Sequence, residues 1–177
     1  MMGGGAPAPT AWPGKGQIQP LVAFPSEGAY VVFVDFWPAE GDQIRLSAPL
    51  SVGASGWPKA EPASLTPDAT PTQRTGDLSV TMKTSGPLRA RRDLTLAFEA
   101  VDDKGRQWAD GIQAISQNVL QLVIVDEKLT RLIRPDIVNR HRLEFATSFP
   151  KAGKYKAWLT FVYDGRPQEL AYVFEVR

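Results

Sequence analysis

The single histidine limits the chemistry that this chain can perform. His141 lies between Arg140 and Arg142, and the chain contains no cysteine. One histidine without cysteine cannot supply a histidine-based zinc site or a Cys–His catalytic pair. A Ser-His-Asp triad would need His141 as its base, and the two neighbouring guanidinium charges disfavour the imidazolium that such a base becomes. We therefore expect no enzymatic activity, and an exposed histidine at a strand edge.

Two pairs of adjacent carboxylates stand at the ends of expected strands, Asp102-Asp103 and Asp126-Glu127. Carboxylate oxygens are ligands that Ca²⁺ prefers, so converging loops could form a weak calcium site. The interpretation that we favour is that these acids form turns and face solvent. The methionines Met1, Met2 and Met82 are too few for a thioether copper site. The sequence thus predicts no cofactor and no resident metal.

A group of arginines is the first candidate for partner binding. Arg89, Arg91 and Arg92 directly precede an expected strand. Because the net charge of the chain is only +1, they form a local patch and not a nucleic-acid footprint. Such a patch can pair with acidic groups on a protein partner or with lipid headgroups. The alternative is that these arginines are solvated loop residues that keep strand edges from pairing.

Aromatic side chains form the second candidate group. Trp12, Trp37 and Trp57 each precede a proline, and all three lie in the first 58 residues. Tryptophan is a preferred interface anchor, and a proline-restrained backbone loses less entropy on docking. Phe33 lies on an apolar strand in the same part of the chain. We expect these four side chains to contact a protein partner; packing on the chain's own sheets and stacking on a sugar remain the alternatives.

The elements that must position these residues are β-strands. The 15 glycines and 15 prolines favour turns over long helices. Apolar and polar residues alternate from Asp93 to Val101, and Val119 to Val125 is an apolar run typical of a strand covered on both faces. We expect an all-β fold in which residues 77–177 form an immunoglobulin-like antiparallel β-sandwich.

The chain before residue 77 is expected to have three parts. Residues 1–16 form an extended arm, residues 17–52 a partial β-module, and residues 53–76 a Pro-rich linker. A few strands alone are only marginally stable. We therefore expect the partial module to pack on the sandwich, on a second copy of the chain, or on a foreign protein.

One motif occurs twice, 125 positions apart. The segment Phe24-Pro25-Ser26-Glu27-Gly28-Ala29-Tyr30 returns as Phe149-Pro150-Lys151-Ala152-Gly153-Lys154-Tyr155, and each copy leads into an apolar strand. In immunoglobulin-like sandwiches, a tyrosine near the start of a strand donates a hydrogen bond to the backbone upstream and closes a corner. Tyr30 and Tyr155 fit this corner. The repeat indicates two copies of one β-unit, the first too short to complete a domain.

The order of motifs after residue 77 carries a resemblance. An Asp-x-x-Gly turn is followed by Leu-Val-Ile-Val, then Leu-x-x-Leu-x-x-Pro, the Phe-Pro-x-x-Gly-x-Tyr motif, an Asp-Gly hairpin and a final Phe-x-Val strand. This order resembles a family of bacterial exported immunoglobulin-like modules. That family usually carries His-x-His-Pro where this chain has Leu132-Ile133-Arg134-Pro135. Both histidines are missing, so a metal-linked role is not implied here.

The resemblance implies export to the periplasm. The chain begins without a basic segment followed by an apolar one, so either a signal peptide was removed or none existed. The sequence holds no run of about 18 apolar residues that would span a membrane. We expect a non-catalytic binding protein, an accessory or stabilising subunit that docks on a larger, membrane-associated complex. The alternative is a ligand-binding module for carbohydrate or a metal ion such as calcium.

Overall fold

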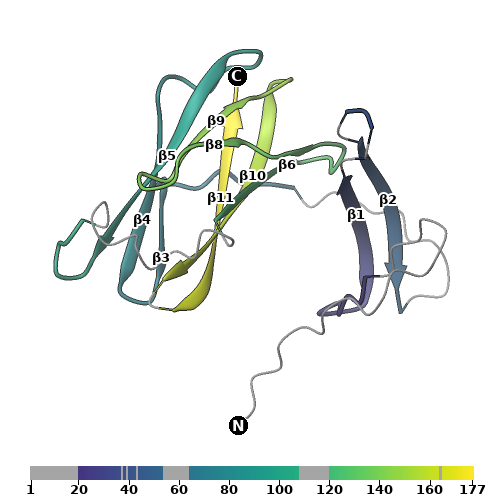
Figure 1. Ribbon diagram of the computed structural model, residues 1–177, viewed down its shortest axis with the longest axis horizontal. Coiled ribbons are helices and arrows are strands. Elements are labelled where there is room, and N and C mark those ends of the chain that lie inside the picture. Colours follow the sequence, from purple (N-terminus) through teal and green to yellow (C-terminus); the bar gives the residue numbers. More distant parts are fainter. Residues whose placement is uncertain are drawn as a thin grey trace, which may run out of the picture. The chain divides into compact units, whose positions relative to one another are not determined.

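The computed structural model of the chain describes residues 20–36, 38, 40–42, 44–53, 64–107, 120–163 and 165–177. All regular secondary structure in these residues is β-strand (Figure 1), which confirms the all-β prediction. The chain divides into two compact units, Met1–Val32 with Ala48–Ala60, and Phe33–Ser47 with Glu61–Arg177. The described residues include no helix that is long and apolar enough to cross a membrane.

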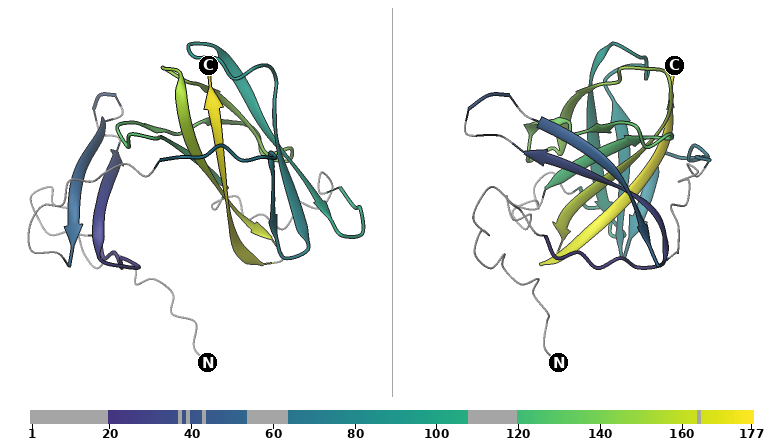
Figure 2. Two further views of the ribbon diagram at one scale, coloured as in Figure 1. Left: turned by 180° about the vertical axis from the view of Figure 1, so that it is seen from behind. Right: turned by 90° about the vertical axis from the view of Figure 1, so that its right-hand side faces the viewer.

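Two antiparallel sheets enclose the core of the larger unit (Figures 1 and 2). The five-stranded sheet has the order β3 (Thr72–Thr75), β4 (Leu78–Thr84), β5 (Asp93–Asp102), β9 (Glu144–Ser148) and β8 (Asp136–Asn139). The four-stranded sheet has the order β11 (Arg166–Val176), β10 (Gly153–Tyr163), β6 (Gln121–Asp126) and β7 (Leu132–Ile133). Separately, β1 (Gly28–Phe36) and β2 (Ile44–Val52) form a two-stranded sheet.

The alternation of side chains explains why these strands form a sandwich. Successive residues of a strand point to opposite faces, so every second residue reaches the core. In β5 the core-facing residues Leu94, Leu96 and Phe98 are buried, whereas Glu99 is exposed. The pairing of β5 with β9 sets Leu96 opposite Phe145, and both side chains are fully buried.

A buried hydrogen bond joins the two sheets. The hydroxyl of Tyr172 on β11 donates to the carbonyl oxygen of Val80 on β4, with 3.1 Å between the oxygens. The ring centroid of Tyr172 lies 5.3 Å from that of Phe98. Burial raises the pKa of Tyr172 far above its usual value, so the hydroxyl stays a neutral donor.

The variant Tyr172→Phe tests this link. We expect it to lower the free energy of unfolding by about 1–2 kcal/mol, because a buried carbonyl loses its hydroxyl partner. Urea unfolding measures the loss. The matched control is Tyr163→Phe, since Tyr163 bonds an exposed carboxylate, that of Asp77. Equal losses in the two variants would show that the hydrogen bond between the sheets contributes no more to stability than a hydrogen bond at the surface.

The sandwich extends into the segment predicted to be a linker. β3 pairs with β4, and further upstream Asp68 contacts β11. The amide of Asp68 donates to the carbonyl of Val173, and the amide of Val173 donates to the Asp68 carboxylate, both at 2.8 Å. Proline-rich composition predicts an irregular backbone but does not identify the strand that such a backbone contacts.

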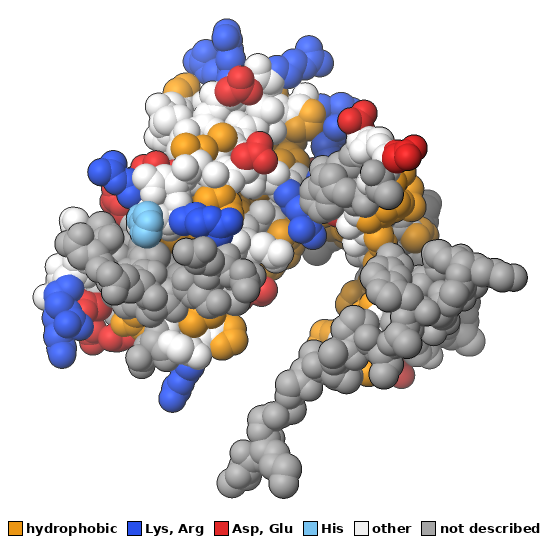
Figure 3. Space-filling view, in the orientation of Figure 1, with side chains coloured by type: hydrophobic (Ala, Val, Ile, Leu, Met, Phe, Trp, Pro, Cys, Tyr) orange, Lys and Arg blue, Asp and Glu red, His pale blue; other side chains and the backbone are white. Residues whose placement is uncertain are grey.

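Within the expected partial β-module, residues 21–24 have no regular secondary structure, and β1 begins only at Gly28. One local prediction differs from the structure, and it concerns the histidine. His141 lies in the turn between β8 and β9, not at a strand edge, and it is exposed (Figure 3). The side-chain oxygen of Asn139 accepts the amides of His141 and Arg142 at 3.0 and 3.2 Å. This local hydrogen bonding competes with strand formation.

Candidate functional site

The two copies of the repeated motif have the same hydrogen bond. The hydroxyl of Tyr155 donates to the carbonyl oxygen of Lys151 at 2.8 Å. In the first copy, the hydroxyl of Tyr30 donates to the carbonyl oxygen of Ser26, also at 2.8 Å. These are the two hydrogen bonds that the corner motif predicts.

The rings and the backbone of the two corners agree as well. The centroid distance is 4.9 Å for Phe149 and Tyr155 and 4.8 Å for Phe24 and Tyr30, with 57° between the planes in each pair. Gly153 has φ 144° and Gly28 has φ 151°, a backbone region that favours glycine. The sequence repeat is therefore also a repeat of local structure.

Burial distinguishes the two copies. In β10 the side chains that follow the corner on its own face, Ala157 and Leu159, have no exposed surface. Their equivalents in β1, Val32 and Val34, are 38% and 43% exposed. The same local unit is thus covered by a second sheet in one copy and left open in the other.

An ion pair shows which side chains share a face of the β1–β2 hairpin. The Arg45 Nε and Asp35 Oδ1 atoms are 2.6 Å apart, so these side chains lie on one face. Because strand residues alternate, Val34, Ile44 and Leu46 lie on the opposite face. Ile44 is 40% and Leu46 is 56% exposed. We call these three residues the hairpin face; Figure 3 shows hydrophobic side chains on this hairpin.

The other face of the hairpin contacts residues of the β7 region close to the hairpin turn. The Asp35 carboxylate is almost fully buried and also pairs with the Nε atom of Arg134 at 2.9 Å. The Arg45 guanidinium donates to the carbonyl of Leu132 at 2.7 Å. Phe33 shares this face with Asp35 and is half-buried. On β1 and β2, the exposed large apolar residues are therefore Val32 and the three residues of the hairpin face, which the sequence did not single out.

Residues 73–177 match the family described as "Domain of unknown function (DUF8832)". The chain belongs to this family. The matched stretch begins within β3 and covers both sheets of the sandwich, so the second corner lies inside the DUF8832 domain and the first lies before it. No curated protein and no solved structure matches the chain.

The predicted arginine cluster lies on the DUF8832 domain, in the connection between β4 and β5. Arg89, Arg91 and Arg92 are all exposed. The backbone of this connection is held firmly, because the amide of Arg91 donates to the carbonyl of Phe149 at 2.7 Å. The Lys and Arg side chains visible in Figure 3 stand in separate groups. On the face that Figure 3 draws, the described Lys and Arg side chains therefore do not form a continuous basic surface such as nucleic-acid-binding proteins present.

Three tryptophans were predicted as partner anchors. Trp12, Trp37 and Trp57 all lie outside the described residues. The described part of the chain contains one tryptophan, Trp158 on β10, which is half-buried. The Lys156 ammonium lies 4.9 Å from its ring centroid. A cation at this distance is attracted to the face of the ring.

The first member of each carboxylate pair holds a turn, and Asp102, which was expected to face solvent, is buried. Asp102 accepts hydrogen bonds from the amides of Lys104 and Arg106 and from the Arg106 guanidinium. Asp126 likewise accepts the amides of Thr130 and Arg131. Among the described residues, no three His, Asp or Glu side chains form a metal-binding group.

The residues that stand where the similar family carries His-x-His-Pro do not fit a metal either. Leu132 is a buried aliphatic residue, and Arg134 is a cation paired with Asp35. Neither side chain is a metal ligand. Where the similar family has two histidines, this chain therefore has two side chains that do not bind metals.

Asp102 is expected to make stability depend on pH. Its burial opposes ionisation, but hydrogen bonds from the amide and guanidinium of Arg106 outweigh burial and lower the pKa of Asp102. A carboxyl whose pKa is lowered by folding stabilises the fold at pH values above its pKa in the unfolded state, which is about 3.9. This contribution is lost as the pH falls through the pKa of the folded state. Asp102→Asn should therefore lower the melting temperature at pH 7 and have a diminishing effect below about pH 4. Thermal unfolding across this range checks the prediction, with exposed Asp103→Asn as the control; a difference independent of pH would contradict it.

Proposed function

We propose that this chain is a non-catalytic binding protein that docks on a protein partner through the hairpin face. The observation that carries the proposal is the contrast between Val34, 43% exposed, and its repeat equivalent Leu159, which has no exposed surface. Ile44 and Leu46 extend the open apolar surface across the second strand. Grouped apolar side chains of this kind mark interaction sites on soluble proteins.

We further propose that the sandwich is immunoglobulin-like. The order β4-β5-β9-β8 in one sheet and β11-β10-β6 in the other corresponds to the ABED and GFC sheets of that fold. The corner residue Tyr155 lies near the start of β10, which takes the place of strand F. By the repeat, β1 takes the place of strand F in a preceding unit and β2 that of strand G. The hairpin face then corresponds to a core surface.

The compartment and the kind of partner follow from the resemblance to bacterial exported modules. We propose a periplasmic location and the role of an accessory or stabilising subunit on a larger, membrane-associated complex. A partial module at residues 17–52 and the Arg89, Arg91 and Arg92 cluster supply two different contact chemistries, one apolar and one basic. An apolar groove on the partner would complement the first surface, and an acidic strip the second.

Affinity isolation with matched variants tests the proposal. The tagged chain is recovered from the native membrane fraction, and the proteins that accompany it are quantified. The test variant combines Val34→Asp with Leu46→Asp. The control is Val138→Asp, because Val138 is 60% exposed on β8 and lies outside the hairpin.

We expect the accompanying protein to fall at least about tenfold with the test variant, since each desolvated charge costs 1.4 kcal/mol or more. The control variant should retain it. Equal recovery with both variants would exclude the hairpin face. A stable monomer in which residues 1–75 resist protease would argue against an external partner altogether.

A further inference from the structure

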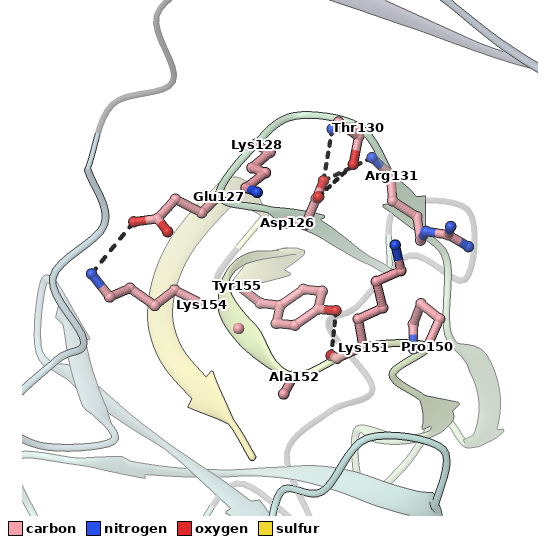
Figure 4. Close-up of a pocket in the computed structure, with 11 residues that line it drawn as sticks. Asp126, Glu127, Lys128, Thr130, Arg131, Pro150, Lys151, Ala152, Lys154 and Tyr155 are labelled. Carbon is pink, nitrogen blue, oxygen red and sulfur yellow. Dashed lines mark hydrogen bonds and ion pairs between the residues drawn. The ribbon is translucent and has the colours of Figure 1, made fainter.

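A small pocket lies beside the second corner, between two loops of the sandwich (Figure 4). One loop joins β6 to β7 and the other joins β9 to β10. The cavity volume is about 170 Å³, which is room for a few waters or one small ion at about 30 Å³ per water. Tyr155 lines the pocket together with residues of both loops.

Cationic side chains outnumber carboxylates in this pocket, because Lys128, Arg131, Lys151 and Lys154 line it together with Asp126 and Glu127. Lys128, Arg131 and Lys151 line it and form no ion pair with a carboxylate of the described residues. Figure 4 shows that Arg131 and Lys128 come from the first loop and Lys151 from the second. Three cations around one concavity repel one another unless an anion joins them.

The two acidic residues of the pocket are already engaged. Asp126 accepts the amides of Thr130 and Arg131 at 2.8 and 2.7 Å and the Thr130 hydroxyl at 2.6 Å. Glu127 accepts the amide of Leu65 at 2.9 Å and pairs with Lys154 at 3.4 Å. The Leu65 amide, against the opposing effect of burial, lowers the pKa of Glu127. These carboxylates hold the loops, and the four cations against two carboxylates leave the pocket lining with a net positive charge.

The first corner shows that the corner structure does not require Lys151 or Lys154. It has Ser26 and Ala29 at the positions of Lys151 and Lys154. Even so, the hydrogen bond of its tyrosine and the distance between its rings match those of the second corner. The geometry of the corner therefore does not require Lys151.

We propose that the corner pocket, formed by Lys128, Arg131 and Lys151 beside Tyr155, binds a small oxyanion of the phosphate or carboxylate class. The planar guanidinium of Arg131 can donate two parallel hydrogen bonds to such a group, and the lysines add point charges. Burial raises the pKa of Tyr155, so its hydroxyl stays neutral beside the anion. This site shares no residue with the hairpin face, so it stands or falls independently of the docking function.

The test is a titration of the full chain with inorganic phosphate and, separately, with citrate, at constant ionic strength. NMR shifts of the amides in both loops are followed, and sodium chloride serves as the reference salt. We expect saturable shifts confined to these loops. Arg131→Gln and Lys151→Ser should each weaken binding at least about tenfold, the loss of one charge-assisted contact. Lys151→Ser introduces the residue of the first corner, so the fold is expected to tolerate it.

The control variant is Arg92→Gln, which removes an exposed arginine outside the pocket. Binding of phosphate alone would identify a phosphate group, and binding of citrate alone a carboxylate. Vesicles that contain phosphatidylglycerol, compared with neutral phosphatidylcholine vesicles, distinguish a lipid-borne phosphate from a free one. Shifts that do not saturate, that sodium chloride reproduces, or that persist in both pocket variants would overturn the proposal.

Discussion

Replacing Phe149 by alanine is expected to lower the free energy of unfolding by about 3–5 kcal/mol. Phe149 has no exposed surface, and its ring packs on both Tyr155 and Phe174, at 4.9 and 5.6 Å between centroids. Alanine would leave a cavity in the centre of the core, where the surrounding sheets cannot collapse to fill it. Urea unfolding followed by far-ultraviolet circular dichroism measures the loss.

The matched control for this variant is Phe24→Ala. Phe24 has the same ring geometry against Tyr30, but it is only half-buried and lies outside the sandwich core. We expect its loss to change the unfolding of the sandwich by less than about 1 kcal/mol, as for a partly exposed residue. If both variants lose the same stability, the hairpin and the sandwich unfold as one cooperative unit, and the contrast between the copies is wrong.

The second large effect concerns a buried charge. Leu159→Asp is expected to prevent folding or to lower stability by several kcal/mol, because it moves a carboxylate into a core position with no partner. Leu159 has no exposed surface and lies on the central strand pair of β10 and β6, opposite Leu122. Circular dichroism and the melting temperature of the purified protein report the outcome.

Val34→Asp is the equivalent change in the first copy. Because Val34 is 43% exposed, the new carboxylate stays solvated, and we expect the melting temperature of the sandwich to be unchanged. The variant then separates folding from docking, since it alters the hairpin face alone. If Val34→Asp unfolds the sandwich, the hairpin face is part of the core.

The features that the sequence predicted correctly are those with local causes. The alternation in β5 follows from side-chain polarity, and the hydrogen bonds of the two corners follow from a seven-residue motif. The fold class needed no long-range information beyond these signals.

The features that the sequence did not predict depend on contacts between distant residues. Asp68 exchanges hydrogen bonds with Val173 on β11, which lies 105 positions further along the chain. The contact of Asp35 with Arg134 joins residues nearly a hundred positions apart. The different burial of Val34 and Leu159 has the same origin, because the burial of an apolar strand residue depends on what covers it.

The corner pocket was not predicted for a related reason. Lys128 and Arg131 are near Lys151 only because the two loops meet, and the spacing of basic residues along the chain gave no sign of it. The signal that was available is the comparison of the two motif copies. A lysine in one copy, where the other has serine, is a difference that the shared geometry does not require.

The two-stranded sheet also has a consequence for the behaviour of free chains at high concentration. Within the described residues β1 has one strand neighbour, β2, so its other edge carries backbone groups that no strand pairs. Tyr30 to Val34 is an uncharged run of aromatic and β-branched residues, the composition that favours intermolecular cross-β stacking. Asp35 and the flanking prolines, Pro25 and Pro38, act as gatekeepers that shorten this run. Self-association through β1 is therefore the aggregation route that we expect first in solutions without a partner.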